Sequence, residues 1–540
     1  VHEQLPVAEA RLVLRPDSLI ELTTLLDGQQ HVAVVGNPGM GKSWLLHQAA
    51  IQLKQAGWAV AVHYCFIDLL DVDREARASI NTMFGSLIAE LREVLPQVSH
   101  SDGPRFAAGA ATLETLLAEA QQRVPAQRIA LIVDGIDHVD RIGNQATGAS
   151  SRLILELANL RLPPGVALII GSQPGQHLQE FPFQDSQLRL SRWPDELLRS
   201  LLEQTELRQV YHNAHRTADT ERLLTTITEK AGGSPLYATY LVKTALTHVR
   251  DAGPLTATGT PVVDIAAYLA TLPAPDVDLH NYYRWLLDGL AAGTRAWWVA
   301  ELLALLDFPV SAIELKEINP GMAHQVQRAL SCLAPVLSEE TAYGGLRIYH
   351  ESFQRYVRQV LRDDDADSAA LLQPVIQWLG KRGFYADLRA FRHLPSLLRA
   401  AGRLPDMLAL VDDDFVAKAA ANGQPADAVL AVLTIVAEAA ADQLAWPELT
   451  RLVELARAAT NLYYERLPGD DMAEQYGRAY ATLHGADALA ARLLYDGRCT
   501  FPVESGLVLC QLCDQQTGSA PWSEYLALLA QQVNKEYGLR

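Results

Sequence analysis

Short unbroken apolar runs alternate with amphipathic segments between residues 31 and 190 of the chain. Such runs are typical of parallel strands buried on both faces, and the segments between them carry apolar residues at helical spacing. The predicted strands are residues 31–35, 58–66, 129–134, 166–170 and 187–190. The predicted helices are residues 45–53, 80–95, 112–122 and 150–160. This alternation predicts a parallel sheet covered by helices on both faces.

Helical periodicity dominates the sequence after residue 190, with one short exception. Helices are predicted over residues 221–230, 282–290, 297–305 and 323–333. Two short segments, 336–338 and 346–349, then flank the pair Gly344-Gly345, which is typical of a β-hairpin. Helices followed by such a hairpin indicate a winged helix, and another helix is predicted to begin at His350.

Two further regions complete the pattern. Residues 251–277 are rich in Gly, Pro, Thr and Ala with weak periodicity, and are predicted to form a loop or linker. From Asp367 onward the sequence is alanine- and leucine-rich with helical spacing. Stacked helix pairs of this kind form a solenoid with a concave face that suits another protein. Because no strict period is visible, a plain helical bundle is the alternative.

Composition and charge narrow the class of protein. The length of 540 residues exceeds what one hydrophobic core supports, and 49% apolar with 20% charged residues is ordinary globular composition. The formal net charge of −18 argues against nucleic-acid binding over the whole surface, although a local basic groove stays open. No apolar run reaches the ~18 residues of a membrane span, and no signal-peptide pattern is visible at the start.

Five scattered cysteines indicate a reduced, cytoplasmic protein. Cys510 and Cys513 form a C-x-x-C pair with Cys499 and His484 nearby in the sequence, so a zinc site is one interpretation. No second pair has metal-ligand spacing. Buried positions three residues apart on a C-terminal helix are therefore the preferred interpretation.

The chain contains a complete phosphate-loop motif. Its residues are Gly36, Asn37, Pro38, Gly39, Met40, Gly41, Lys42 and Ser43, which match the pattern G-x-x-x-x-G-K-[ST] between a predicted strand and a predicted helix. Backbone N–H groups and the helix N-terminus would bind phosphate oxygens of ATP or ADP. Lys42 is expected to reach the β- and γ-phosphates, and the Ser43 hydroxyl to ligate Mg²⁺. The alternative, a glycine-rich turn with an accidental Lys-Ser pair, is disfavoured by the matching context.

An acid ends the apolar run of residues 129–134. In a parallel sheet, Asp134 emerges at the C-terminal edge, where ligands bind. Asp134 is therefore predicted to be the Walker B acid, which holds Mg²⁺ through water. The strand at residues 58–66 lies between the phosphate loop and this acid, which indicates a P-loop NTPase that activates water with an acid near Walker B.

The segment Asp134-Gly135-Ile136-Asp137-His138 resembles the D-G-x-D-E signature of the STAND signalling NTPases, particularly their NACHT-like branch. The resemblance implies that Asp137 is a second catalytic acid, which polarises the attacking water. His138 replaces the usual glutamate. Gln173 stands where the family tends to carry the arginine of Ser-Arg-Pro, its γ-phosphate sensor. Losing that charge weakens transition-state stabilisation more than binding, so a slow ATPase is expected.

Two further matches extend the resemblance. Gly233-Ser234-Pro235 matches the G-x-P motif, whose proline packs on the nucleotide base, while a helix-capping glycine followed by a helix-starting proline is the alternative. His350 matches the winged-helix histidine that contacts the β-phosphate of ADP in this family, and a helix-start residue with local hydrogen bonds is the alternative. DNA binding by the winged helix is disfavoured, because residues 322–333 contain Arg328 as their single Lys or Arg.

The resemblance covers residues 10–405 and implies an ATP/ADP switch. An ADP-bound closed monomer is opened by a protein trigger on the repeats, ATP replaces ADP, and the NTPase domains self-associate. Bacterial relatives commonly detect phage proteins and activate an effector such as a nuclease. No effector motif is visible, and the chain starts at Val1 and ends at Arg540 within helical sequence. We therefore expect the sensor and switch portion of a longer protein, with a processed start as the alternative.

Two rival functions stay open. One is a STAND-type transcription regulator, which requires a DNA-binding domain outside this chain. The other is an AAA+-like motor or loader, which requires an arginine finger and fast turnover. For the switch, no membrane partner is expected and a nucleic-acid partner is disfavoured.

The predicted fold class is α/β plus all-α, in four parts. A P-loop NTPase domain with an AAA+/STAND-like parallel sheet is expected over residues 1–195, and a helical domain with linker over 196–275. A winged-helix domain is expected over residues 276–366, and a TPR-like α-helical repeat region with a sensor role over 367–540.

Overall fold

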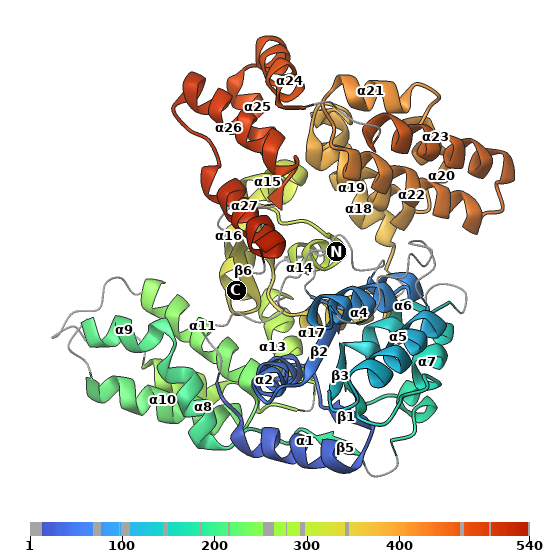
Figure 1. Ribbon diagram of the computed structural model, residues 1–540. Coiled ribbons are helices and arrows are strands. Elements are labelled where there is room, and N and C mark those ends of the chain that lie inside the picture. The colour runs from blue at the N-terminus through green and yellow to red at the C-terminus, as the bar shows by residue number, and fades with distance from the viewer. Residues whose placement is uncertain are drawn as a thin grey trace. The chain divides into compact units, whose positions relative to one another are not determined.

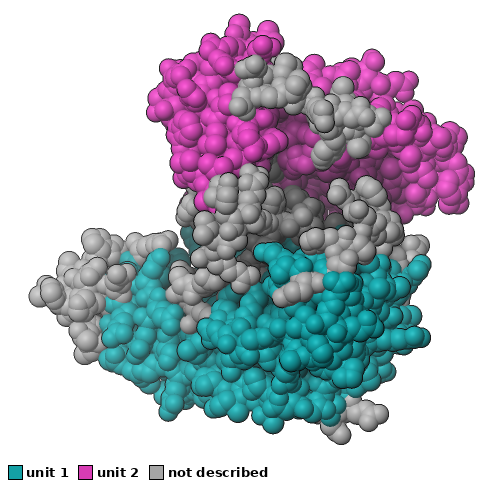
Figure 2. Space-filling model, in the orientation of Figure 1, with its two compact units in different colours: residues 1–293, 331–336, 348–356 teal, residues 294–330, 337–347, 357–540 magenta. Residues whose placement is uncertain are grey.

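The computed structural model describes most of the chain. The described residues are 13–67, 77–96, 98, 109–143, 149–183, 186–213, 217–251, 264–276, 278–291, 297–340, 345–364, 366–464, 469–495 and 498–537. They form two compact units, coloured separately in Figure 2. Unit 1 comprises residues 1–293, 331–336 and 348–356, and unit 2 comprises residues 294–330, 337–347 and 357–540. The four-part division expected from the sequence stays a prediction.

Unit 1 contains a five-stranded parallel sheet with the strand order β2-β3-β4-β1-β5 (Figure 1). Its strands are β1 His31–Val35, β2 Ala59–Tyr64, β3 Ile129–Asp134, β4 Val166–Ser172 and β5 Gln187–Arg189. Each pair of neighbouring strands in this sheet is parallel. The five predicted strands and the predicted parallel sheet are therefore confirmed.

Helices cover both faces of this sheet. Leu131 and Val133 of β3 belong to a core with α4, α5, α6 and α7, whereas Ala130 and Ile132 belong to a core with α1 and α2. Burying each of the larger side chains contributes about 1.5–3 kcal/mol. Because successive residues enter different cores, the strand appears in the sequence as one apolar run. The covering helices are α1 Pro16–Gly28, α2 Lys42–Gln55, α4 Ile80–Val94, α5 Ala110–Arg123, α6 Ile136–Gly143 and α7 Ala149–Ala158.

Helices follow the sheet in unit 1. They are α8 Asp195–Glu203, α9 Glu206–Asn213, α10 Thr217–Ala231, α11 Pro235–Asp251, α12 Ile265–Thr271 and α13 His280–Ala291. The prediction that residues 251–277 form a linker is wrong at α12, although residues 252–263 and 277 lie outside the described residues. Asp264 caps α12 by accepting a hydrogen bond from the Ala267 N–H, and Ile265 and Leu269 are buried. With Ala266, three buried positions in so short a helix leave little periodicity in the sequence.

A winged-helix order of elements comes next in the chain. Its elements are α14 Trp297–Leu305, α15 Ala312–Ile318, α16 Ala323–Leu333, β6 Leu337–Glu340, β7 Gly345–Ile348 and α17 Glu351–Asp363. β6 and β7 pair with each other as predicted, while Gly344 lies outside the described residues. Sequence periodicity missed α15, although Ser311 and Glu314 form a capping box at its start.

The rest of unit 2 is dominated by helices, which confirms the predicted helical repeats. They are α18 Ser368–Arg382, α19 Leu388–Ala400, α20 Leu404–Leu410, α21 Phe415–Ala421, α22 Ala426–Asp442, α23 Trp446–Tyr464, α24 Gly469–His484, α25 Ala486–Leu493, α26 Val503–Thr517 and α27 Trp522–Tyr537. A short antiparallel pair, β8 Leu494–Tyr495 and β9 Arg498–Cys499, was not predicted. None of the described helices is long and apolar enough to span a membrane.

The C-x-x-C pair lies on α26. Cys510 and Cys513 are both fully buried in a core with Leu509 and Tyr525, as the preferred interpretation predicted. Burial raises the pKa of the Cys510 thiol to about 12, which opposes the thiolate form that binds zinc. Among the described residues, no group of three or more His, Cys, Asp or Glu side chains is placed to hold a metal ion.

Candidate nucleotide-binding site

The carboxyl ends of three neighbouring strands meet at one edge of the sheet. The register pairs Val35 of β1 with Ser172 of β4, and Asp134 of β3 with Gly171 of β4. The phosphate loop follows β1, so it lies beside the ends of β3 and β4. In an open parallel sheet this edge is where ligands bind.

The phosphate loop makes a tight turn between β1 and α2. Gly39 has a φ angle of +72°, which favours glycine. A Cβ at Gly39 would lie 2.5 Å from the Cβ of Leu236, so a side chain there would also clash. Leu236 follows the buried Pro235 at the start of α11. The G-x-P motif therefore lies against the phosphate loop.

Two side chains hold the carbonyl group of Met40 on the outside of the loop. The Trp193 Nε1–H donates to this oxygen at 3.0 Å, and Arg15 Nη1 donates at 3.2 Å. In a trans peptide the C=O and the following N–H point in opposite directions. The N–H of Gly41 is therefore directed away from Trp193 and Arg15. Sequence analysis did not identify these two residues, because neither belongs to a local motif.

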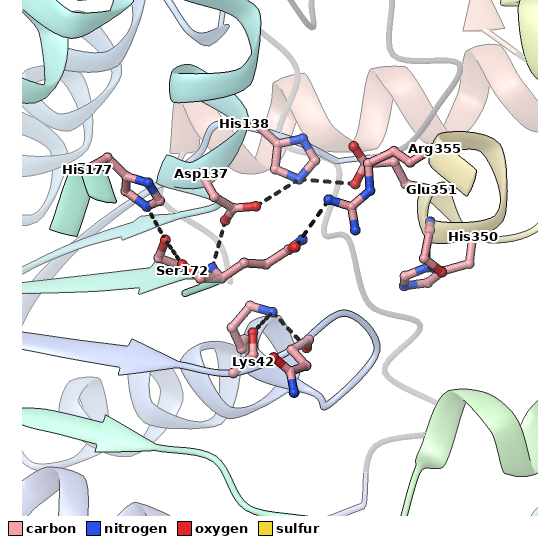
Figure 3. A network of polar contacts seen from close by, with 12 residues as sticks. Lys42, Asp137, His138, Ser172, His177, His350, Glu351 and Arg355 are labelled. Carbon is pink, nitrogen blue, oxygen red and sulfur yellow. Dashed lines mark hydrogen bonds and ion pairs between the residues drawn. The ribbon is translucent and has the colours of Figure 1, made fainter. Parts of the chain in front are cut away.

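Lys42 bends back over the loop that precedes it. Its Nζ donates to the carbonyl oxygens of Gly36 at 2.8 Å and Asn37 at 3.1 Å (Figure 3). Lys42 is also the first residue of α2, whose N-terminus carries a partial positive charge. The ammonium group, the helix end and the loop N–H groups together fit a ligand with a chain of phosphates.

Ser43 and Asp134 fit a magnesium ion. The Ser43 hydroxyl donates a hydrogen bond to the Asp134 carboxylate, so two hard oxygen ligands lie side by side. Burial raises the pKa of Asp134, while the Ser43 bond and the charge of Lys42 act to lower it. A Cβ at Gly171 would lie 2.2 Å from an Asp134 carboxylate oxygen, so only glycine leaves room for that carboxylate.

Asp137 lies in α6, a helix that sequence periodicity missed. The carboxylate is 5% exposed, and its Oδ1 accepts a hydrogen bond from the Gln173 N–H at 3.1 Å. The neighbouring Ser172 hydroxyl lies 2.7 Å from His177 Nε2 (Figure 3). These contacts fix the backbone that follows β4 next to the second predicted acid.

His138 contacts a residue far away in the sequence. Its ring stacks on Phe66 with centroids 4.0 Å apart, and its Nε2 lies 3.5 Å from Glu351 Oε2. Glu351 is the first residue of α17. The N-terminal turn of α17 is therefore part of the site in unit 1.

His350 precedes that turn, and its protonation state follows from its surroundings. Burial lowers the pKa of His350 to about 4; the charge of Glu351 acts to raise it, and the positive charges of Arg355 and Lys42 act to lower it. The ring is therefore neutral at pH 7. Because Nδ1 accepts the Ser352 backbone N–H at 3.1 Å, the ring proton is placed on Nε2. His350 thus has an N–H donor on the side opposite Ser352.

A chain of hydroxyl groups supports this arrangement. The Ser352 hydroxyl lies 2.8 Å from His350 Nδ1, and the Tyr283 hydroxyl lies 2.6 Å from Ser352 Oγ. Tyr283 is fully buried on α13. The local hydrogen bonds that were the alternative reading of His350 are present. They orient the ring and are compatible with a phosphate contact through Nε2.

Arg355 places a positive charge beside residue 173, where the sequence has a neutral glutamine. Its Nη1 donates to Gln173 Oε1 at 3.2 Å (Figure 3). The two residues are 182 positions apart, so no local pattern predicts the contact. A guanidinium from α17 therefore lies beside the glutamine that stands where the family tends to carry its arginine.

The structure brings most of the predicted site residues to one place. The phosphate loop, Asp134, Asp137 and His350 all belong to unit 1, and Pro235 adjoins Leu236 next to the loop. Their roles toward a nucleotide and Mg²⁺ stay predictions.

Comparison with known proteins identifies the domain that carries this site. The model of the NACHT domain matches residues 30–192. Among curated proteins, no sequence matches the chain. Similar solved structures include a Walker-type ATPase of Pyrococcus abyssi, with 12% identity, a TM-score of 0.32, and coverage of 64% of this chain and 96% of that one.

Two more solved structures are similar at the same level. One is a STAND protein with a tetratricopeptide repeat sensor from Pyrococcus horikoshii, with 12% identity, a TM-score of 0.29, and coverage of 98% of this chain and 78% of that one. The other is the ORC2 protein of Aeropyrum pernix, with 12% identity, a TM-score of 0.31, and coverage of 64% and 92%. Likenesses at these scores carry no weight for function. The phosphate-loop and D-G-x-D motifs lie within the matched segment, so residues 30–192 are similar to a NACHT domain and carry its nucleotide-binding motifs.

Proposed function

We propose that this protein is a signalling switch governed by ATP and ADP. The observation that carries the proposal is the position of the first turn of α17 in the nucleotide site. His350 precedes this turn, and Glu351 and Arg355 contact His138 and Gln173. A nucleotide that binds at the phosphate loop would therefore meet groups from both the NTPase sheet and the winged helix.

The proposed contact between His350 and the nucleotide uses the Nε2–H. A neutral imidazole that donates to a charged β-phosphate contributes ~1.5–3 kcal/mol, the range for hydrogen bonds to charged groups. In a two-state equilibrium between closed and open forms this corresponds to about a ten- to hundredfold bias toward the closed form. A bias of that size is large enough to hold a switch in its inactive form.

Magnesium would supply charge neutralisation at the phosphates when bound. Ser43 would be a direct ligand and Asp134 would hold the ion through water. Asp137 would orient and polarise the attacking water, since its carboxylate is held by the Gln173 N–H. Lys42 would exchange its two carbonyl partners for the β- and γ-phosphates.

We propose that a protein trigger binds the helical repeats of unit 2. An exposed apolar strip on α23 supports this: Trp446 is 60% and Val453 is 53% exposed, and residues seven apart lie on one helix face. Triggering would exchange ADP for ATP and allow self-association, which activates an effector outside this chain. We further propose that the trigger is a phage protein, that the role is anti-phage defence, and that the protein is cytoplasmic.

Two measurements on the purified protein test the switch. Denaturation followed by chromatography identifies the nucleotide that copurifies, and ADP is expected. Size-exclusion chromatography with ATP then compares the wild type with His350→Ala and Lys42→Ala. His350→Ala should self-associate without a trigger, whereas Lys42→Ala should stay monomeric.

Gln359→Ala is the matched control, because Gln359 is an exposed residue on α17. It should behave like the wild type. If His350→Ala keeps the wild-type ADP affinity and stays monomeric, His350 is only a helix-start residue and does not hold the switch.

A further inference from the structure

Arg355 has an unusual environment for a guanidinium group. Its Nη1 donates a hydrogen bond to a neutral partner, the Gln173 side-chain amide, at 3.2 Å. Its Nε is buried and has no hydrogen-bond partner among the described residues. A guanidinium offers five N–H donors, so this side chain retains capacity for an anion.

Arg355 lies at the end of the candidate nucleotide site where β4 ends. Gln173 follows β4, and its N–H binds Asp137, the predicted water-polarising acid. Asp134 lies beside β4 at the paired Gly171. A residue held by Gln173 is therefore on the side of the site where the bond to the terminal phosphate would be broken.

Charge also favours an anion at this place. Arg355 is near enough to His350 for its positive charge to lower the pKa of that ring. His350 is neutral and the Gln173 amide carries no charge, so neither of these neighbours neutralises the guanidinium. Guanidinium groups bind phosphate oxygens in a bidentate geometry, and such charged pairs are stronger than neutral ones.

We propose that Arg355 binds the terminal phosphate of a nucleoside triphosphate, and that the winged helix thereby distinguishes ATP from ADP. Gln173 is the positioning residue that holds the guanidinium. The inference rests on the proposed nucleotide site. Arg355 would supply from α17 the positive charge that residue 173 lacks.

The test compares triphosphate and diphosphate binding by calorimetry. The probes are the non-hydrolysable β,γ-imido analogue of ATP and ADP, each with Mg²⁺. Arg355→Gln should weaken binding of the analogue by about ten- to hundredfold, the range for a hydrogen bond to a charged group. Binding of ADP should change less than about threefold, which also shows that the variant is folded.

Two further variants sharpen the test. Arg362→Gln removes the same charge from an exposed position on α17 and should change neither affinity. The exchange variant, Gln173→Arg with Arg355→Gln, places the charge on the other member of the pair. It should recover at least part of the lost preference for the triphosphate.

The outcomes separate this inference from the proposed function. If the wild type binds neither probe, the proposed nucleotide site itself is wrong. If the wild type binds both and Arg355→Gln weakens both equally, or neither, Arg355 does not read the terminal phosphate. If Arg355→Gln binds the triphosphate more tightly, the contact with Gln173 is a latch that opposes ATP, and the inference is overturned.

Discussion

His63 on β2 is buried in the NTPase sheet and makes stability depend on pH. It is 2% exposed, and its Nε2 lies 2.9 Å from the Arg77 carbonyl oxygen. Burial lowers the pKa of His63 to about 4, whereas the unfolded chain titrates near the ordinary value of 6.5. The unfolded state therefore binds the proton first as pH falls. The contribution of His63 to the free energy of unfolding is therefore fully present above pH 6.5 and is lost as pH falls toward 4.

Through His63, the free energy of unfolding is expected to fall by about 2 kcal/mol between pH 7.5 and pH 5. Denaturant unfolding of the wild type and His63→Gln at these two pH values measures it. The glutamine variant should lose less stability on acidification, because its amide does not titrate. Equal losses in both proteins would show that His63 is not the source.

Residues in continuous motifs were predictable from the sequence, and residues that depend on the fold were not. The sequence predicts Lys42, Ser43 and Asp134 as site residues, because binding of phosphate and Mg²⁺ requires particular residue types at a particular spacing. Arg355 and Gln173 meet only after 182 intervening residues have folded. No local pattern carries that information.

At the scale of the element, β4 must pass close to the acid of β3. A Cβ at Gly171 would lie 2.2 Å from Asp134 Oδ1 and 2.5 Å from Leu46 Cδ1. Gly171→Ala should therefore destabilise the protein by about 1–3 kcal/mol through overpacking, and should also weaken Mg²⁺-dependent nucleotide binding. Thermal unfolding with and without Mg²⁺ and nucleotide measures both effects.

Gly289 on α13 provides the matched control. An added Cβ there meets no atom within 4 Å, so Gly289→Ala should be neutral or slightly stabilising in a helix. Should Gly171→Ala prove as stable as Gly289→Ala, the close approach of β4 to Asp134 is not real.

The five strands of the sheet were predicted, whereas the long helices α1 and α11 and the short helices α6, α12 and α15 were missed. Short helices carry too few apolar positions to show their period. α6, α12 and α15 have 8, 7 and 7 residues. Their positions depend on capping groups such as Ser311 and on burial against neighbours, which periodicity alone does not record.

At the scale of the whole molecule, the rival account is a motor with fast turnover. We expect steady-state ATP hydrolysis at or below ~1 s⁻¹, at the low end of the usual range. His138 replaces the usual glutamate and is held between Phe66 and Glu351, so it does not replace a catalytic carboxylate. A phosphate-release assay measures the rate. Turnover of tens per second by the isolated protein would favour the motor.

The fold class of the whole chain followed from element order, whereas its partners did not. The chain contains, in this order, a phosphate-loop sheet, a winged-helix order of elements and helical repeats. The surface to which we propose that a trigger binds includes exposed residues of α23 such as Trp446, which belong to no chemical motif.

The most direct test of the central claim is calorimetric binding of ADP and ATP, each with Mg²⁺, to three proteins. The wild type should bind both, and Lys42→Ala should bind neither measurably, because Lys42 is the cation of the phosphate loop. Lys54→Ala removes an exposed lysine from the last turn of the same helix α2 and should bind like the wild type. Equal nucleotide affinity of Lys42→Ala and the wild type would contradict the account.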